Sequence, residues 1–565
     1  MNEKKLLPPP SPYQLAIREA FCKTNDNLLV QACAGSGKTT LLAQLCETLD
    51  FMTSAVALSF NKVIAESFKQ KLPYFVKSCT MHSLGYEICR KNIDKTKMDP
   101  NKRDNVLKKL IKSAGFNKSD APLIASDADW LIGMALATMT DLNDTAAVMR
   151  MASAYNGELN MPDLSASIAA EALVQCRKDR QTIGFDDMID APLFHGYQPL
   201  KFSVVMVDES QDLTLQQMEF LKMILAPEGR IVAVGDRWQS IYQWRGADSS
   251  AMDLIKKTFN CVEMPLSICY RCPVAVVDMA RQITTTIEVS ASAIKGEVDV
   301  RRQNQYDDLI PTLEPGTMVV CRLNAPLMPM AMALIRRGTK VIIRGKDIGG
   351  GLVSMVNKLD TVIREKNPNL LTVPRELFLE SLLTEAQRKV KKAIDADKMS
   401  SALFAIDQYE TIVAAFAEVT SVPELVDVLK RIFSDDVTGV VLSSVHRAKG
   451  LEAPTVVILG PELMPHPCAQ FASNRDEAMQ QENNLKYVAI TRSMQKLILQ
   501  PLKGRVTASA DALLEFLQRK AGPTRSAVDD FAPRGEMAAD AVARGMDEDF
   551  EDAGKTQSQI DEENA

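Results

Sequence analysis

A lysine and two threonines follow a short glycine-containing turn near the start of the chain. The segment reads LLVQACAGSGKTTLLAQL, residues 28–45, with Gly35 and Gly37 just before Lys38. A hydrophobic run enters the turn and a leucine-rich helical pattern leaves it, while Ala32 replaces the first glycine of the strict P-loop. Backbone N–H groups of such a turn can approach phosphates at a helix N-terminus, and the lysine can reach the β- and γ-phosphates. The segment therefore predicts a nucleotide site.

A nucleotide site of this kind also needs acids, and VVMVDESQD, residues 204–212, supplies them. Four apolar residues place Asp208 at the carboxyl end of a strand, where open α/β sheets bind ligands. We expect Asp208 and Thr39 to ligate Mg²⁺ and the neighbouring Glu209 to orient and deprotonate water. This pairing favours nucleotide hydrolysis over a solvated acidic loop.

Short hydrophobic runs that are each followed by a turn must position these groups. Besides the run before the P-loop they are residues 55–60, 202–208, 230–236, 317–322, 339–345, 439–445, 455–460 and 496–500. Nearly continuous Val, Ile and Leu is typical of parallel strands buried on both faces. With helical patterns between them, the runs predict doubly wound α/β architecture with enough strands for two sheets.

Two stretches interrupt that rhythm and read as helical insertions. Residues 91–180 show no clear strand, and residues 352–438 contain no glycine and form successive amphipathic patterns.

Composition narrows the class of protein. The chain of 565 residues is 46% hydrophobic and 24% charged, as in globular proteins, and contains no apolar segment of about eighteen residues that could span a membrane. The N-terminus lacks an apolar core of secretory length, and the eleven cysteines are scattered, so we expect a cytoplasmic location. Cys269 and Cys272 form one Cys-x-x-Cys without a second pair, which argues against a zinc site.

The net charge of −6 hides an uneven distribution. Residues 521–565 hold twelve acids and four bases, a net charge of −8, so the rest of the chain carries +2. The acidic, aromatic-poor segment predicts a disordered tail that could recruit a protein partner. A mildly basic body is compatible with a nucleic-acid partner.

Four further segments extend the pattern in order along the chain. They are VGDRWQSIYQWRGAD (234–248), LSICYRCP (266–273), VHRAKGLEAPTVVIL (445–459) and ENNLKYVAITRS (482–493). Together with the P-loop and Asp-Glu-Ser-Gln-Asp, this set resembles the ordered motifs of superfamily 1 DNA helicases, most closely the UvrD/Rep/PcrA branch. The resemblance runs from about residue 10 to 500.

The resemblance implies two tandem RecA-like domains with helical insertions. The first RecA-like, ATP-binding domain is expected at 1–90 and 181–265 and the second at 266–351 and 435–520. The insertions are expected at 91–180 and 352–434, followed by the tail at 521–565. The second insertion occupies the place of the family's second mobile domain but is much shorter.

The resemblance also implies roles around ATP. Gln14 would read the adenine edge, Tyr270 would stack on adenine, and Glu452 would touch the ribose. Gln239 would sense the γ-phosphate, while Arg271 and Arg492 would act as arginine fingers. The phosphate loop itself would consist of Ala34, Gly35, Ser36, Gly37, Lys38, Thr39 and Thr40, with Thr40 in place of the family's usual arginine.

For nucleic acid, the resemblance assigns base stacking to Tyr242 and Trp244, next to Arg245. Contacts to phosphate or base are expected from Asn61, Thr80, His82 and His446. Phe60 is given no role because the spacing to Asn61 is one residue shorter than usual in the family. Without the resemblance, Trp244 could equally be a core residue.

These expectations describe an ATP-dependent DNA helicase and single-stranded DNA translocase, an ATP hydrolase of DNA repair, replication or recombination. The resemblance implies 3′→5′ polarity and binding to single-stranded DNA and single/double-strand junctions. Two alternatives remain open: a translocase that strips proteins from DNA with weak unwinding, and a nucleotide-switched clamp on nucleic acid.

Overall fold

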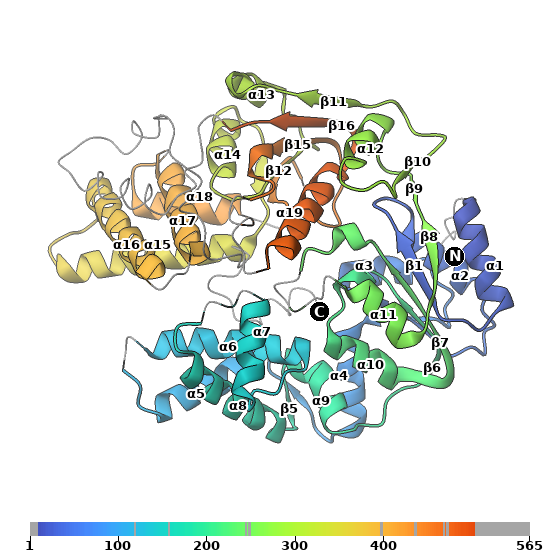
Figure 1. Cartoon of the computed structure of the whole chain (residues 1–565). Helices are drawn as coiled ribbons and strands as arrows, with labels where there is room; N and C mark the ends of the chain where they lie inside the picture. Colours follow the sequence, from blue (N-terminus) through green and yellow to red (C-terminus); the bar gives the residue numbers. More distant parts are fainter. Residues whose placement is uncertain are drawn as a thin grey trace. The chain divides into compact units, whose positions relative to one another are not determined.

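A computed structural model of the chain describes residues 9–502, except 61, 118, 119, 156, 158, 243–245, 247–249, 396–398, 418, 434–437, 467, 468 and 470–473. The described chain divides into two compact units, each built around a parallel sheet (Figure 1). The first unit runs to Tyr270 and also includes Thr285–Ser290, while the second comprises Arg271–Thr284 and the chain from Ala291 onward. The predicted acidic tail lies outside the described residues, and the domain limits drawn from the sequence stay predictions.

The sheet of the first unit has six parallel strands in the order β3-β2-β6-β7-β1-β8. The strands are β1 (Leu28–Ala32), β2 (Ala55–Ser59), β3 (Lys77–Thr80), β6 (Phe202–Val207), β7 (Leu225–Gly235) and β8 (Val262–Leu266). Along β6, Val204 and Met206 enter one hydrophobic cluster, whereas Val205 and Val207 enter another. The sheet is therefore buried on both faces, which explains the continuous apolar runs.

Helices cover the two faces of this sheet. The first cluster contains residues of α1 (Pro12–Lys23), α2 (Lys38–Cys46) and α3 (Lys62–Lys69). The second contains residues of α4 (Met81–Asn92), α9 (Phe185–Phe194), α10 (Leu215–Ile224) and α11 (Ala251–Phe259). Two short strands of the same unit, β9 (Ile268–Cys269) and β10 (Glu288–Val289), pair with each other in parallel. The predicted doubly wound α/β fold is confirmed for this unit.

The first insertion is a helical bundle with a core of its own. It consists of α5 (Lys102–Ser113), α6 (Ala121–Thr138), α7 (Thr145–Ala154) and α8 (Pro162–Lys178). At its base, β4 (Lys97–Met98) pairs with β5 (Thr182–Ile183), a short pairing that no pattern in the sequence predicted.

Buried ion pairs attach this insertion to α9. Lys102 Nζ lies 2.7 Å from Asp187 Oδ2, and Arg177 Nε lies 2.8 Å from Asp190 Oδ2. The Arg103 side chain, 3% exposed, donates to Asp186 Oδ2 at 2.8 Å. Because removal of one partner would leave an uncompensated buried charge, these pairs hold the insertion and the α/β core together.

The second unit contains the second six-stranded parallel sheet, in the order β11-β16-β15-β12-β14-β13. Its strands are β11 (Glu297–Val300), β12 (Met318–Cys321), β13 (Val341–Ile343), β14 (Val440–Ser444), β15 (Ala453–Leu459) and β16 (Ser493–Gln500). The α-helices outside the insertion are α12 (Val274–Ala280), α13 (Tyr306–Leu309), α14 (Leu327–Arg336) and α19 (Arg475–Ile490). The predicted second α/β sheet is thereby confirmed.

The second insertion shares a single core with this sheet. Its helices are α15 (Lys346–Lys366), α16 (Arg375–Asp395), α17 (Met399–Phe416) and α18 (Val422–Ile432). One hydrophobic cluster joins Val319 and Leu442 of the sheet with Val356, Phe378 and Phe416 of the helices. The four helices therefore share the core of the second unit, whereas the first insertion has a core of its own.

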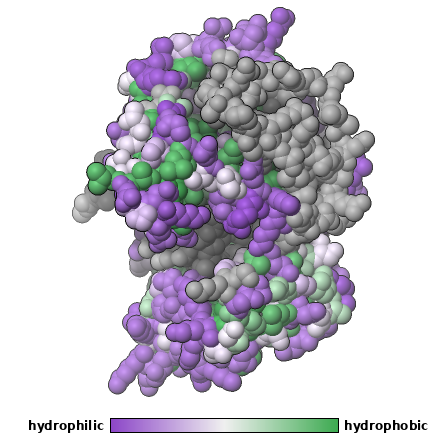
Figure 2. All heavy atoms as spheres, turned by 90° about the vertical axis from the view of Figure 1, so that its left-hand side faces the viewer, coloured by the Kyte–Doolittle hydropathy of each residue, from purple (hydrophilic) through white to green (hydrophobic). Residues whose placement is uncertain are grey.

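Apolar side chains also reach the surface of the first insertion. Met139, Met149, Leu164 and Val174 are between 37% and 55% exposed. On the face shown in Figure 2, hydrophobic surface is interspersed with hydrophilic side chains. Among the described residues, no helix combines the length and apolar character needed to cross a bilayer.

A buried carboxylate ties α17 to the second sheet. Asp407 Oδ1 accepts the Ala325 N–H at 2.6 Å, in the turn between β12 and α14. Burial raises the pKa of Asp407 to about 6, against the effect of hydrogen bonds from Ala325 and Asn324. In the unfolded chain an aspartate has a pKa of about 3.9.

This difference predicts a pH-dependent stability of the second unit. Because the folded-state pKa is raised, the contribution of Asp407 is complete below about pH 4 and is lost as the pH rises through about 6. Between about pH 5 and 7.5 we expect this group to lower the free energy of unfolding by about 1–2 kcal/mol. The Asp407→Asn variant keeps a carbonyl acceptor for Ala325 and should lose that part of the pH dependence.

Amide hydrogen exchange of peptides from β12 and α17, compared between wild type and Asp407→Asn at each pH, measures the effect. The pKa of Glu410 is raised to about 7 by burial and by the charge of Asp407, so Glu410 acts in the same direction. Asp407→Asn removes the second of these causes, which adds to the expected loss of pH dependence. Equal ratios of exchange rates at the two pH values would contradict the prediction.

Candidate active site

The turn after β1 has the geometry of a phosphate loop. Gly35 and Gly37 have φ angles of 68° and 83°, in the left-handed region that favours glycine. The Ser36 hydroxyl closes the turn by donating to the Cys33 carbonyl at 2.9 Å, and α2 begins directly afterwards at Lys38. Because the first N–H groups of a helix have no intrahelical partner, the start of α2 favours an anion.

Asp208 and Glu209 meet this loop at the carboxyl end of β6. Lys38 Nζ lies 3.0 Å from Glu209 Oε1, and the Thr39 hydroxyl donates to Asp208 Oδ2 at 3.2 Å. The φ angle of Glu209 is 52°, a backbone strain of a kind that clusters at functional sites. The loop lysine and threonine thus face the two acids that the sequence paired with them.

The electrostatics of this cluster keep the lysine charged. Burial lowers the pKa of Lys38, but the carboxylates of Glu209, Asp236 and Asp208 outweigh burial and raise it above its ordinary value. Burial, aided by the charge of Glu209, raises the pKa of Asp208 to about 6. A hydroxyl next to a carboxylate is an oxygen pair suited to Mg²⁺, which takes few protein ligands and completes its shell with phosphates and water.

Two residues to which the sequence assigned no role connect Glu209 to Gln239. Gln211 Nε2 donates to Glu209 Oε2 at 2.6 Å, and Gln211 Oε1 accepts the Asp236 N–H at 2.9 Å. Asp236 Oδ2 in turn accepts from Gln239 Nε2 at 2.7 Å. Gln211 lies in the 3-10 turn η1 (Ser210–Asp212) and Gln239 in η2 (Arg237–Gln239). The position of Asp236 at the end of β7, the strand beside β6, was the signal that could have revealed this chain.

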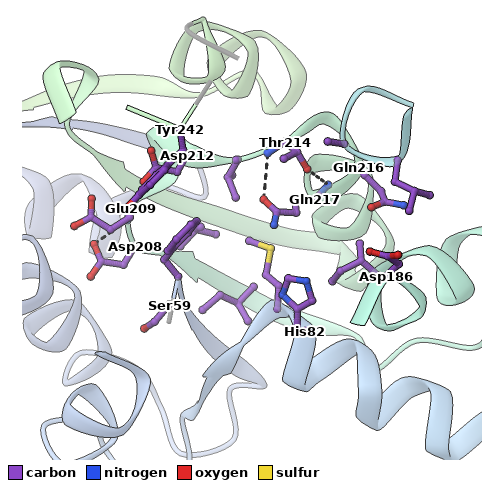
Figure 3. Close-up of a pocket in the computed structure, with 18 of the residues that line it drawn as sticks. Ser59, His82, Asp186, Asp208, Glu209, Asp212, Thr214, Gln216, Gln217 and Tyr242 are labelled. Carbon is purple, nitrogen blue, oxygen red and sulfur yellow. Dashed lines mark hydrogen bonds between the residues drawn. The ribbon is translucent and has the colours of Figure 1, made fainter. Parts of the chain in front are cut away.

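A pocket lies on the other side of the two acids (Figure 3). Its residues come from the ends of β2 and β6, from α4, α9 and α10, and from α6 of the first insertion. Asp208 and Glu209 line it together with His82 and Tyr242. Two of the predicted nucleic-acid residues therefore share a pocket with the acids of the phosphate site.

Phe60 also lines this pocket and contacts Tyr242. The two rings lie nearly parallel, with an interplanar angle of 9° and a centroid distance of 5.8 Å. Thr80 is 2% exposed and caps α4, where its hydroxyl accepts the Ser83 N–H at 3.1 Å. It thereby positions the helix turn that carries His82.

Comparison of the chain with models of known protein families finds two matches. The model of the UvrD/REP helicase N-terminal domain matches residues 14–260, and that of the UvrD-like helicase C-terminal domain matches residues 354–503. The two matches together cover well over half of the chain. The chain belongs to the UvrD/Rep/PcrA family of superfamily 1 helicases. It is an ATP-hydrolysing DNA helicase.

Individual relatives are distant. The ATP-dependent DNA helicase PcrA of Staphylococcus aureus (strain Mu50 / ATCC 700699) is 23% identical over 612 residues, which cover 85% of this chain and 82% of the relative. The ATP-dependent DNA helicase PcrA of Staphylococcus epidermidis (strain ATCC 12228 / FDA PCI 1200) is 28% identical over 254 residues, or 41% of this chain and 34% of the relative.

In this helicase, Gln14 and Tyr270 both lie beside the phosphate loop. Gln14 is 5% exposed. Its Nε2 lies next to Gly37 of the loop, 3.3 Å from the point where a Cβ atom would stand if this residue were not glycine. Tyr270 donates its backbone N–H to the Gly35 carbonyl at 2.9 Å, while its side chain is half exposed. Both positions are compatible with contacts to a nucleobase next to the loop.

Three predicted site residues of the second unit, Arg271, Glu452 and Arg492, lie close together in the structure. Arg271 Nε lies 2.6 Å from Glu452 Oε2, and Arg271 Nη1 contacts the Thr491 carbonyl at 3.4 Å. Arg492 is 1% exposed and donates to the Val488 carbonyl at 2.9 Å. His446 is also buried and lies two residues after the end of β14. Asn61, Trp244 and Arg245 lie outside the described residues.

Proposed function

We propose that this helicase moves along single-stranded DNA in the 3′→5′ direction, coupling each ATP hydrolysis to closure of two RecA-like domains. One observation carries the proposal: Asp208 and Glu209 contact the phosphate loop on one side and line the pocket of Tyr242 and His82 on the other. If these two side chains move during hydrolysis, the wall of the nucleic-acid pocket would move with them, because the same residues belong to both sites.

At the ATP site, Lys38 would bind the β- and γ-phosphates, leaving Glu209 to orient and deprotonate water. Thr39 and Asp208 would hold Mg²⁺, which would neutralise charge on the phosphates. Gln14 and Tyr270 would contact adenine and Glu452 the ribose. Gln239 would report the γ-phosphate to Glu209 through Asp236 and Gln211, the hydrogen-bonded chain described above.

Arg271 and Arg492 would supply positive charge to the transition state when the domains close. Such arginine fingers contribute roughly 10³–10⁵ to the rate of phosphoryl transfer. Hydrolysis would then depend on closure, which makes each turnover a mechanical cycle.

The DNA strand would follow the carboxyl edges of the sheets. Tyr242 and Phe60 offer aromatic faces for base stacking, each stack being worth roughly 1–3 kcal/mol. His82 and His446 would contact the strand, with Thr80 positioning the former, and Asn61, Trp244 and Arg245 are proposed from the resemblance alone. We extend the proposal to binding at single/double-strand junctions and to a protein partner for the tail.

Displacement of streptavidin from biotin at one end of single-stranded DNA tests movement and its direction. We expect ATP-dependent displacement from the 5′ end to exceed displacement from the 3′ end, because a 3′→5′ motor runs toward the 5′ end. Equal, ATP-independent release at both ends would refute translocation. ATPase rates with single-stranded DNA, duplex DNA and RNA identify the preferred track.

A second candidate is a translocase that strips proteins from DNA with weak unwinding. The short second insertion favours it, because in the family the domain at this place regulates unwinding and here it is much reduced. A forked-duplex assay beside the streptavidin assay separates the candidates. Movement with unwinding indicates the helicase motor, movement alone indicates the stripping translocase, and neither indicates a nucleotide-switched clamp.

A further inference from the structure

The pocket between Asp208 and Glu209 and the first insertion is lined by acidic residues, which is unusual for a site that binds DNA. Four acidic residues line it, Asp186, Asp208, Glu209 and Asp212, whereas no lysine or arginine is among the described residues of its wall. Two of the four carboxylates pair with cations behind the wall, Glu209 with Lys38 and Asp186 with Arg103. Figure 3 shows these side chains around the same hollow as Tyr242 and His82. Because like charges repel strongly away from bulk water, a phosphate is disfavoured here. An uncharged nucleobase, with an apolar face for Phe60 and Tyr242, suits the pocket better.

Some of the polar atoms that line the pocket already form hydrogen bonds with other protein atoms. At the start of α10, Gln217 Oε1 accepts the Thr214 N–H at 3.1 Å and the Thr214 hydroxyl accepts the Gln217 N–H at 3.2 Å. These bonds leave the Gln217 amide nitrogen as a donor. Gln216 donates from its amide nitrogen to Asp190 at 3.2 Å, which leaves its carbonyl oxygen as an acceptor.

Two further groups complete this inventory. Asp186 Oδ2 accepts from Arg103 at 2.8 Å, and an ionised carboxylate has lone pairs for further donors. The Ser59 hydroxyl, 4% exposed, has no hydrogen-bond partner among the described residues. A buried hydroxyl without a partner is costly in a folded protein, so Ser59 is a group whose partner is expected to be a ligand.

Acceptors thus outnumber donors on the wall. Cytosine and adenine present an amino donor beside a ring-nitrogen acceptor, whereas thymine presents carbonyl oxygens on both sides of a single N–H. Carboxylates accept from the amino groups and repel the thymine carbonyls. Resting on the proposed function, in which the strand crosses this edge, we propose that the pocket selects cytosine and adenine over thymine, with Asp186 as the specificity-determining residue. The Ser59 hydroxyl, which can both donate and accept, would add a contact to either kind of base.

The experiment compares two DNA homopolymers of equal length, one of 5-methylcytosine and one of thymine. The two bases carry the same methyl group and differ at the hydrogen-bonding edge. The readout is the concentration of each that gives half-maximal stimulation of ATP hydrolysis by the full chain. We expect half-saturation at a concentration roughly tenfold lower for 5-methylcytosine, the size of one good bidentate contact.

Two variants locate the preference. Asp186→Asn adds an amide donor for a thymine carbonyl and keeps an oxygen for Arg103, while Ser59→Ala removes a hydroxyl that holds no protein contact among the described residues. Asp186→Asn is expected to bring the ratio between the polymers toward one. Ser59→Ala removes a group that can donate or accept, so it should raise the half-saturating concentration of both polymers alike. Asp163→Asn, the same change at an exposed position in the first turn of α8, should leave the ratio unchanged.

The proposal is overturned if the unmodified protein responds equally to both polymers, or if Asp186→Asn keeps the full preference. Equal stimulation by both polymers leaves DNA-dependent hydrolysis in place and removes only the selectivity. Hydrolysis that no polymer stimulates would instead contradict the proposed function itself.

Discussion

Replacement of Glu209 by glutamine is expected to lower the rate of DNA-stimulated ATP hydrolysis by about 10²–10⁴-fold. Glutamine has nearly the same shape but cannot take a proton from water. It keeps a carbonyl oxygen for Lys38 and Gln211, the two side chains that now hold Glu209. ATP binding should persist, because the phosphate loop and Lys38 are unchanged. Steady-state hydrolysis and equilibrium binding of a fluorescent ATP analogue measure the two effects separately.

The matched control for this substitution is Glu219→Gln. Glu219 lies on α10 of the same unit and pairs with Lys222 at the surface. The Glu219→Gln protein should hydrolyse ATP at the wild-type rate. Lys38→Ala is expected to weaken ATP binding as well as hydrolysis, because the cation that faces the phosphates is lost. Turnover preserved in Glu209→Gln would refute the assignment of Glu209 as the base.

Replacement of Arg271 by alanine is expected to lower the same rate by about 10³-fold or more. A guanidinium that meets the transferred phosphoryl group only in the closed state stabilises the transition state and not the bound nucleotide. The dissociation constant for ATP should therefore change little while the maximal rate collapses. Arg492 is a poorer target, because its buried guanidinium donates to the Val488 and Leu451 carbonyls, which would lose their partners.

Arg281→Ala provides the comparison for Arg271→Ala. Arg281 lies at the end of α12 in the same unit, where it pairs with Asp278 on the surface. Its loss should leave the maximal rate within about twofold of wild type, as expected for an exposed ion pair. A rate for Arg271→Ala close to that of Arg281→Ala would exclude Arg271 as a finger.

The parallel strands at the centres of the sheets could be predicted because burial on both faces forces a nearly continuous apolar run. β6 and β14 are such strands; Asp208 follows β6 directly, and His446 lies two residues after the end of β14. β3, β8 and β11 escaped prediction, and all three lie at an edge of their sheet. An edge strand is partly solvated, so sequences such as EVDV keep polar residues and lose the hydrophobic signal.

The sequence by itself determined the chemistry of the phosphate site and the α/β class. A P-loop lysine, a strand-terminal aspartate and the following glutamate are local patterns, since each role depends on the few residues around it. Only the tertiary structure decided what surrounds them. The stacking of Phe60 on Tyr242, the chain from Glu209 to Gln239 and the carboxylates of the pocket all join segments far apart in sequence. So does the single core of the second insertion and its sheet. Such contacts are set by which strands become neighbours and which helices cover them, and no periodicity within one segment records that choice.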